Sequence, residues 1–125
     1  MIVGLGIDLV ELDRVERLLA RWGSAFLARI MSEGEAAALP AGAPPSAVAE
    51  SVALKEAASK AIGTGWSRGV RWRDVVVDHR AGGAPAVRLE ALALATARRL
   101  GSSGATEVRV ERRPGLVLAT VRLLA

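Results

Sequence analysis

The chain has 125 residues, of which 51% are hydrophobic and 24% charged, with a formal net charge of +4 and no cysteine. This length fits one compact domain of ordinary globular composition. The lack of cysteine excludes disulfides, thiol catalysis and cysteine metal sites. No apolar run approaches the ~20 residues that cross a bilayer, and the first residues lack the basic segment of a secretory signal. We therefore expect a cytoplasmic protein with no membrane partner.

The basic net charge attracts anions, which include nucleic acids, acidic proteins and phosphorylated small molecules. Aromatic side chains make up only 3% of the chain and consist of Trp22, Phe26, Trp66 and Trp72. Stacking of single-stranded nucleic acid needs an exposed aromatic cluster, and the sequence contains none, so a nucleic-acid-binding protein is the weakest alternative. We interpret Trp22 and Phe26 as core anchors.

The first half of the chain predicts one strand followed by helices. An apolar run with two glycines predicts a buried strand over residues 2–7, and Asp8 follows it directly. Apolar residues at helical spacing predict a helix over residues 12–22. Further helices are expected from Ser24 and, through a Ser-x-x-Glu capping box, from Ser32.

The second half predicts a long helix and two antiparallel hairpins. After a proline-rich loop, the expected elements are a helix over 46–62, a strand over 72–77, its return strand over 86–89 after a turn at 81–85, a helix over 90–100, and a final hairpin of strands 107–112 and 116–123. Gly63 is the expected stop of the long helix. The whole pattern predicts a single α+β domain over residues 1–125.

Only two of the 17 basic residues are lysines, and Lys55 and Lys60 lie in one short segment with Glu56. Glu56 and Lys60 share a helix face, which in isolation indicates a surface ion pair worth ~0.3–0.5 kcal/mol. Two carboxylates together with substrate phosphates are the usual ligands of Mg²⁺. Asp8 could meet Glu56 for this purpose, or it could cap the helix that follows it, for which Asp13 is a rival.

Two further features leave alternatives open. His79 is the only histidine, lies near a predicted turn and is expected to be solvated. Arg14, Arg17 and Arg21 fall on one face of the helix over 12–22. These arginines either solvate the helix or bind an acidic partner helix.

Two segments carry motifs whose order and separation are informative. They read Gly6-Ile7-Asp8-Leu9-Val10-Glu11 and Lys55-Glu56-Ala57-x-x-Lys60-Ala61-x-Gly63-Thr64-Gly65, and the minor segments Ile30-Met31-Ser32-x-x-Glu35 and Gly83-Ala84-Pro85 accompany them. Together they resemble the holo-acyl-carrier-protein synthase family, the short, trimeric class of 4′-phosphopantetheinyl transferases. The resemblance implies the fold of that family, with a long helix packed on a small antiparallel sheet.

The resemblance also implies an activity. Members of this family transfer the 4′-phosphopantetheine arm of coenzyme A to a serine of an acyl carrier protein and release adenosine 3′,5′-bisphosphate. Asp8 and Glu56 match the family's Mg²⁺ ligands, and Lys60 matches a lysine that contacts phosphate and protonates the leaving group. Either Glu56 or a metal-ordered water would deprotonate the carrier serine.

The remaining site residues follow from the same resemblance. Gly63, Thr64 and Gly65 match the turn beside the nucleotide. Arg14 and Arg21 fall where the family's first helix meets the acidic carrier protein. The family's site lies between subunits of a trimer, so a homotrimer is implied.

The final strand departs from the family pattern, which reads roughly His-Val-Ser-Leu-Ser-His-Thr. Here the stretch over residues 107–113 is Glu-Val-Arg-Val-Glu-Arg-Arg, and Ser51 replaces an arginine of the family. Arg112, with Arg109 and Arg113, is a candidate to replace the lost phosphate contacts, because a guanidinium binds phosphate well. The departure favours a specialised carrier protein of polyketide or fatty-acid synthesis. The alternative is a non-catalytic relative that serves as a binding or assembly module.

Overall fold

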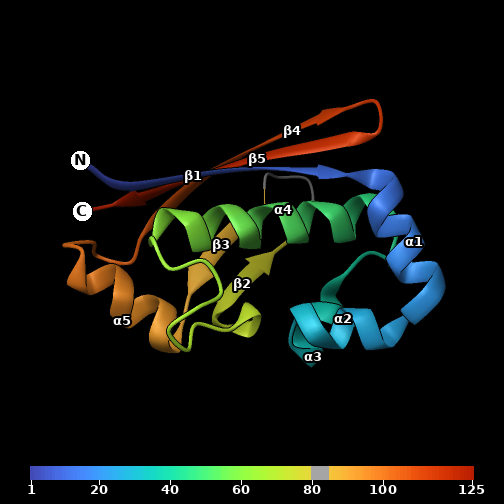
Figure 1. The fold of residues 1–125 in the computed structure, drawn as a ribbon, viewed down its shortest axis with the longest axis horizontal. Coiled ribbons are helices and arrows are strands. Elements are labelled where there is room, and N and C mark those ends of the chain that lie inside the picture. The colour runs from blue at the N-terminus through green and yellow to red at the C-terminus, as the bar shows by residue number, and fades with distance from the viewer. Residues whose placement is uncertain (80–84) are drawn as a thin grey trace.

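A long central helix lies against one face of a three-stranded antiparallel sheet (Figure 1). The computed structural model describes residues 1–79 and 85–125. Its elements are β1 (Ile2–Glu11), α1 (Leu12–Trp22), α2 (Ser24–Ile30), α3 (Glu33–Ala38), α4 (Pro45–Ala61), the 3₁₀ helix η1 (Trp72–Asp74), β2 (Val75–Asp78), β3 (Ala86–Leu89), α5 (Ala91–Arg99), β4 (Thr106–Arg113) and β5 (Leu116–Leu124). The sheet order is β1-β5-β4, and β2 pairs with β3 in a separate two-stranded sheet. The predicted α+β architecture is therefore confirmed.

The helix α4 is enclosed by other elements along most of its length. The three-stranded sheet covers one side, and the β2–β3 sheet and the remaining helices lie on the other (Figure 1). Alanines dominate its buried positions, and Ala53 and Ala57 are fully buried. Pro45 occupies the first turn, where its missing N–H costs nothing. At the other end Gly63 adopts a φ of +81°, so the predicted stop is confirmed.

Two glycines set how closely β1 approaches α4. A Cβ atom added at Gly6 would overlap the carbonyl oxygen of Ala57, and one added at Gly4 would overlap that of Ala61. The strand can pack directly on the helix backbone only because both positions lack a side chain. Because alternate strand residues share a face, Asp8 follows Gly6 on the face that meets α4.

A buried ion pair joins the elements on the opposite side of α4. The Lys55 ammonium lies 3.0 Å from Glu35 Oε2 and donates to the carbonyl oxygens of Trp72, at 3.0 Å, and Val75. Glu35 also accepts the backbone N–H of Val77 at 3.0 Å. Burial lowers the pKa of Lys55, and its contacts with Glu35 oppose that shift. Lys55 is fully enclosed, so it stabilises the packing of these elements and cannot contact a substrate phosphate.

The structure corrects several local predictions. β1 continues to Glu11, so Asp8 lies inside a strand rather than after its end. Trp22 is 54% exposed and is not a core anchor. Gly23, not Ser24, occupies the N-cap position of α2. The first part of the predicted strand over 72–77 is the 3₁₀ helix η1. The capping box of Ser32 and Glu35 at the start of α3 is confirmed.

The outer face of the large sheet is apolar along β1. Leu5, Ile7 and Leu9 are 54%, 52% and 55% exposed, so β1 is buried on one face only, contrary to the sequence prediction. On the same face of β4 the side chains are charged. In the part of the chain that the structure describes, no helix is long and apolar enough to cross a bilayer. The turn predicted at 81–85 falls mostly on residues 80–84, outside the described ranges.

Candidate active site

Three residues predicted for the site converge between β1 and the C-terminal half of α4. The Lys60 ammonium lies 2.8 Å from Asp8 Oδ1 and also donates to the carbonyl oxygen of Ile7 at 3.2 Å. Glu56 lies one helical turn before Lys60 on the same helix. The close packing of β1 on α4 therefore brings together an aspartate, a glutamate and a lysine from distant parts of the sequence.

The two carboxylates of this cluster repel each other. The pKa of Glu56 is raised above its ordinary value of 4.5, chiefly by burial and next by the negative charge of Asp8. The Trp66 indole N–H, Lys60 and Arg14 oppose this shift without reversing it. A cation placed between the carboxylates would remove the repulsion.

Lys60 carries a stable positive charge. Its hydrogen bond to Asp8 raises its pKa above 10.5; burial opposes this shift, and the negative charges of Asp8 and Glu56 add to it. Its side chain is 52% exposed. At neutral pH Lys60 is therefore an ammonium ion that can donate a proton or bind an anion, and it cannot serve as a base.

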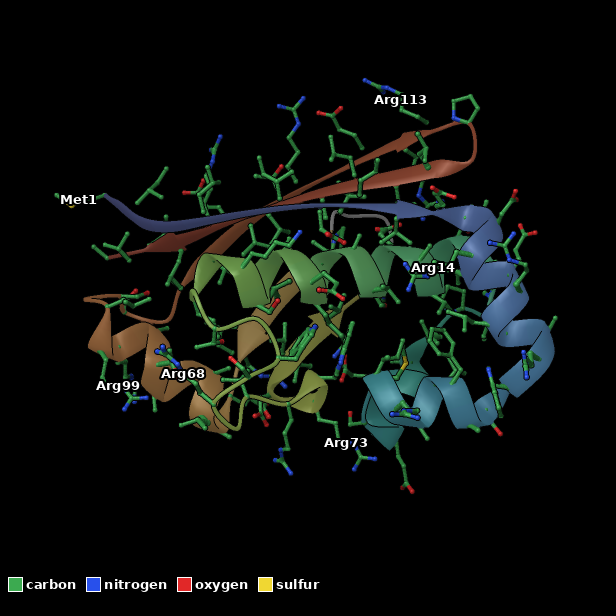
Figure 2. The ribbon with its side chains drawn as sticks, viewed as in Figure 1. Met1, Arg14, Arg68, Arg73, Arg99 and Arg113 are labelled. Carbon is green, nitrogen blue, oxygen red and sulfur yellow. The ribbon has the colours of Figure 1, made fainter. Side chains whose placement is uncertain are left out.

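A cavity of about 390 Å³ opens beside the cluster. Its polar lining includes Asp8, Glu11, Arg14 and Glu56, while the rest is mainly apolar and comes from α1, α2, α4, β1 and η1. In Figure 2 Arg14 lies on α1 close to α4. The carboxylates thus face a space that is large enough for part of a substrate.

The donor set fits a magnesium ion that is completed by substrate. Within residues 1–79 and 85–125, no group of three or more histidine, cysteine, aspartate or glutamate side chains is arranged to hold a metal. Mg²⁺ commonly binds through one or two carboxylates while phosphate oxygens and water fill its other positions. Asp8 and Glu56 could supply the carboxylates of such a site.

The glycine-containing turn after α4 is held tightly to the helix. Gly63 N–H donates to Lys60 O at 3.0 Å, and Gly65 N–H donates to Ser59 O at 3.1 Å. The hydroxyl of Thr64 donates to the carbonyl of Gly65 at 2.9 Å. Both glycine N–H groups are already used inside the chain, so contact between this turn and a nucleotide stays a prediction.

Arg112 lies away from the cluster, on β4. Its Nε donates to Glu50 Oε2 at 3.0 Å, and Glu50 is almost fully buried near the start of α4. A separate cavity of about 360 Å³ is lined in part by Glu50, Arg109 and Arg112. Within one chain the structure does not bring Arg112 to the carboxylates.

Ser51, the residue that replaces the family's arginine, has a specific partner. Its hydroxyl lies 2.8 Å from His79 Nε2. His79 is therefore partly buried and hydrogen-bonded, and the expectation that it is solvated is wrong. The two arginines predicted for the carrier protein are both exposed on α1, and Arg21 lies 5.0 Å from the ring centroid of Trp22.

Sequence reasoning missed two tryptophans beside the cluster. Trp66 and Trp72 stack with ring centroids 4.1 Å apart and an interplanar angle of 18°. Trp72 lines the cavity beside Glu56. The indole N–H of Trp66 is buried and has no hydrogen-bond partner among the described residues. The one sequence feature that could have indicated a place for Trp66 near the cluster is its position directly after the Gly63–Gly65 turn.

Comparison with known proteins gives one consistent result. The 4′-phosphopantetheinyl transferase superfamily matches residues 4–119. The holo-[acyl-carrier-protein] synthase of Solidesulfovibrio magneticus is 50% identical over 103 residues, which cover 82% of this chain and 83% of that protein. The crystal structure of holo-[acyl-carrier-protein] synthase from Neisseria meningitidis matches with a TM-score of 0.84 and 35% identity, and covers 100% of both chains.

A second solved structure carries a ligand. The Helicobacter pylori holo-[acyl-carrier-protein] synthase in complex with coenzyme A has a TM-score of 0.80 and 25% identity, with coverage of 95% of this chain and 98% of that one. These likenesses extend over nearly the whole fold and confirm the resemblance that the two sequence motifs indicated.

Proposed function

The chain belongs to the 4′-phosphopantetheinyl transferase superfamily, and we propose that Asp8, Glu56 and Lys60 form the site of a magnesium-dependent holo-acyl-carrier-protein synthase. The reaction transfers the 4′-phosphopantetheine arm of coenzyme A to a serine of an acyl carrier protein and releases adenosine 3′,5′-bisphosphate. The names of the curated relatives and the coenzyme A complex of the Helicobacter pylori enzyme support these substrates.

The convergence of the three side chains is the observation that carries this proposal. Asp8 and Glu56 would hold the metal, which when bound neutralises charge that develops on the transferred phosphate. Lys60, kept protonated by Asp8, donates a proton or a hydrogen bond to the leaving phosphate oxygen. The proton of the carrier serine would pass either to the Glu56 carboxylate or to a water molecule that the metal orders.

The nucleotide contacts proposed from the sequence are Arg112 and the turn over residues 63–65. The turn begins three residues after Lys60, which supports its proposed position near the phosphates that Lys60 would contact. The Arg112 side chain remains 56% exposed in spite of its ion pair with Glu50. Its guanidinium can therefore also bind a phosphate, if a neighbouring protomer brings that phosphate to β4.

The basic face of α1 is the proposed docking surface for the carrier protein. Arg14 and Arg21 are exposed on this helix, and Arg14 also lines the cavity beside Asp8 and Glu56. An acidic carrier helix bound at these arginines would approach the cavity. We place the carrier protein in fatty-acid or polyketide synthesis, in the cytoplasm.

A homotrimer is the proposed assembly of this single domain. The exposed apolar row of Leu5, Ile7 and Leu9 on the outer face of the sheet supports it, because a contiguous apolar patch on the surface commonly marks an interface. The family resemblance implies a homotrimer, so we propose copies of the same chain as the partners that cover this face.

The alternative is a non-catalytic member of the same superfamily. The pairing of Arg112 with Glu50 favours this alternative, because it occupies one of the arginines expected to replace the lost nucleotide contacts. Incubation of the chain with apo acyl carrier protein, coenzyme A and Mg²⁺, followed by intact mass measurement, separates the two functions. A carrier mass increased by one phosphopantetheine supports the synthase, and an unchanged mass with a folded sample supports the alternative.

A further inference from the structure

The indole N–H of Trp66 has an unusual environment. It is a buried donor with no hydrogen-bond partner within the described parts of the chain. Such a group costs ~1–3 kcal/mol when it is left without a partner, and buried donors of this kind are rare. This N–H would therefore stabilise any arrangement of the site that gave it an acceptor.

The carboxylate that this indole affects is that of Glu56, and the ring on which Trp66 stacks, Trp72, lines the same cavity as Glu56. The indole does not reach hydrogen-bonding geometry, yet it lies close enough to lower the pKa of Glu56. Glu56 is also the residue that Asp8 repels. A cation between Asp8 and Glu56 would remove that repulsion and allow the carboxylate to settle in one orientation.

The indole ring itself is well fixed. Trp66 stacks on Trp72, and the carbonyl of Trp72 accepts a hydrogen bond from the buried Lys55. The backbone that leads into Trp66 is also fixed, because a hydrogen bond from Gly65 N–H to Ser59 O anchors the preceding turn. The stacking and the anchored turn thus fix the orientation of the indole ring and its N–H.

We propose that Trp66 is a positioning residue for Glu56: its indole N–H donates to one carboxylate oxygen and leaves the other oxygen directed at the bound cation. The inference rests on the proposed function, since it assumes the cation site at Asp8 and Glu56. An indole N–H can only donate, so Trp66 orients the ligand and does not coordinate the metal. Residues that orient a metal ligand in this way typically contribute 10–100-fold to metal affinity.

Nuclear magnetic resonance provides the direct test. The chain contains three tryptophans, so a ¹⁵N-labelled sample gives three indole resonances, and the loss of one in Trp22→Phe and of one in Trp66→Phe assigns all three. On addition of Mg²⁺ and coenzyme A, the Trp66 indole proton is expected to move downfield as the hydrogen bond forms. The exposed Trp22 resonance serves as the internal control.

Cation affinity provides the second readout. Trp66→Phe keeps a ring to stack on Trp72 and removes only the N–H. With coenzyme A present, the Mn²⁺ dissociation constant, measured by electron paramagnetic resonance of free Mn²⁺, is expected to rise about 10–100-fold in this variant. Trp22→Phe is expected to leave it unchanged. If Trp66→Phe does not fold, the indole resonance of the wild-type protein, assigned by through-bond experiments, decides alone.

The outcomes separate this inference from the proposed function. A downfield shift together with weaker Mn²⁺ binding supports the positioning role. If the backbone resonances of Asp8 and Glu56 respond to Mg²⁺ while the Trp66 indole does not, the positioning role is wrong and the cation site stands. If Asp8 and Glu56 do not respond either, the cation site is wrong and this inference falls with it.

Discussion

The two lysines of the chain, five positions apart, have opposite environments. Lys55 is fully buried in an ion pair with Glu35, whereas Lys60 is half exposed and paired with Asp8. The residues that surround each lysine in space, rather than its neighbours in the sequence, decide which lysine stabilises the fold and which is available to a substrate.

Replacement of each lysine by methionine distinguishes these roles. Lys60→Met is expected to reduce the transfer rate about 100-fold or more, because a positioned general acid contributes 10²–10⁴-fold, with little change in stability. Lys55→Met is expected to lower the free energy of unfolding by about 3–5 kcal/mol, because it leaves the buried Glu35 carboxylate without its counterion. Steady-state kinetics and urea unfolding of both variants check this, and equal destabilisation by the two changes would contradict it.

Glu56 determines how the site responds to pH. Its folded pKa is raised, so folding favours its protonated form; this contribution to stability is present below its ordinary value of 4.5 and is lost as the pH rises through the raised value. At pH 7 the ionised Glu56 therefore destabilises the fold. Glu56→Gln is expected to raise the melting temperature at pH 7 and to have little effect near pH 4. Calorimetry at both pH values checks this, and an equal shift at both would contradict it.

At the scale of elements, the approach of β1 to α4 creates the site. Gly4 and Gly6 allow the strand to lie on the helix backbone, and this contact brings Asp8 to Lys60.

Gly6→Ala tests this packing. The added methyl group would overlap the carbonyl of Ala57, and overpacking of this kind typically costs about 1–3 kcal/mol. We expect a loss of stability near the upper end of that range, with reduced transfer because Asp8 moves. Gly34→Ala in α3 is the matched control: its nearest atom is Ser32 Oγ at 3.9 Å, and a helical alanine gains roughly 0.5–1 kcal/mol. Similar unfolding curves for both variants would argue against the packing role.

Much of the element pattern was predictable because it depends on local sequence. The capping box at Ser32, the stop at Gly63 and the final hairpin all follow from residue types at fixed spacings. The meeting of Asp8, Glu56 and Lys60 was predictable only through the motif resemblance, because no local pattern shows that β1 and α4 bring them together. The β1–α4 contact depends on two glycines that lack side chains. The sequence alone indicates that the backbone can approach another element closely at these positions, but not which element it approaches.

Other features depend on tertiary contacts that leave no local signal. The burial of Lys55, the pairing of Arg112 with Glu50 and the hydrogen bond between Ser51 and His79 each join residues from different elements. The sequence predicts Trp22 as a core residue because it continues an apolar stripe. In the structure Trp22 is the last residue of α1, and more than half of its side chain is exposed.

At the scale of the whole molecule, the apolar row on β1 is the feature that a single chain leaves unexplained. Ile7→Glu places a charge at the centre of this row, where the side chain is already 52% exposed in the isolated chain. We expect this variant to remain folded and to become monomeric, because an unpaired buried charge is costly at an interface. Light scattering after size exclusion gives the mass, and an unchanged mass relative to the wild type would contradict the proposed interface.

The measurement that tests the central claim most directly is the transfer of phosphopantetheine to apo acyl carrier protein by wild type, Asp8→Asn and Glu56→Gln. Glu33→Gln on the exposed start of α3 is the matched control. We predict that intact mass shows transfer by the wild type and the control, none when EDTA is present, and none by the two site variants, while circular dichroism shows that all four proteins are folded. Transfer by both site variants at the wild-type rate would contradict the assignment of Asp8 and Glu56 as the magnesium site.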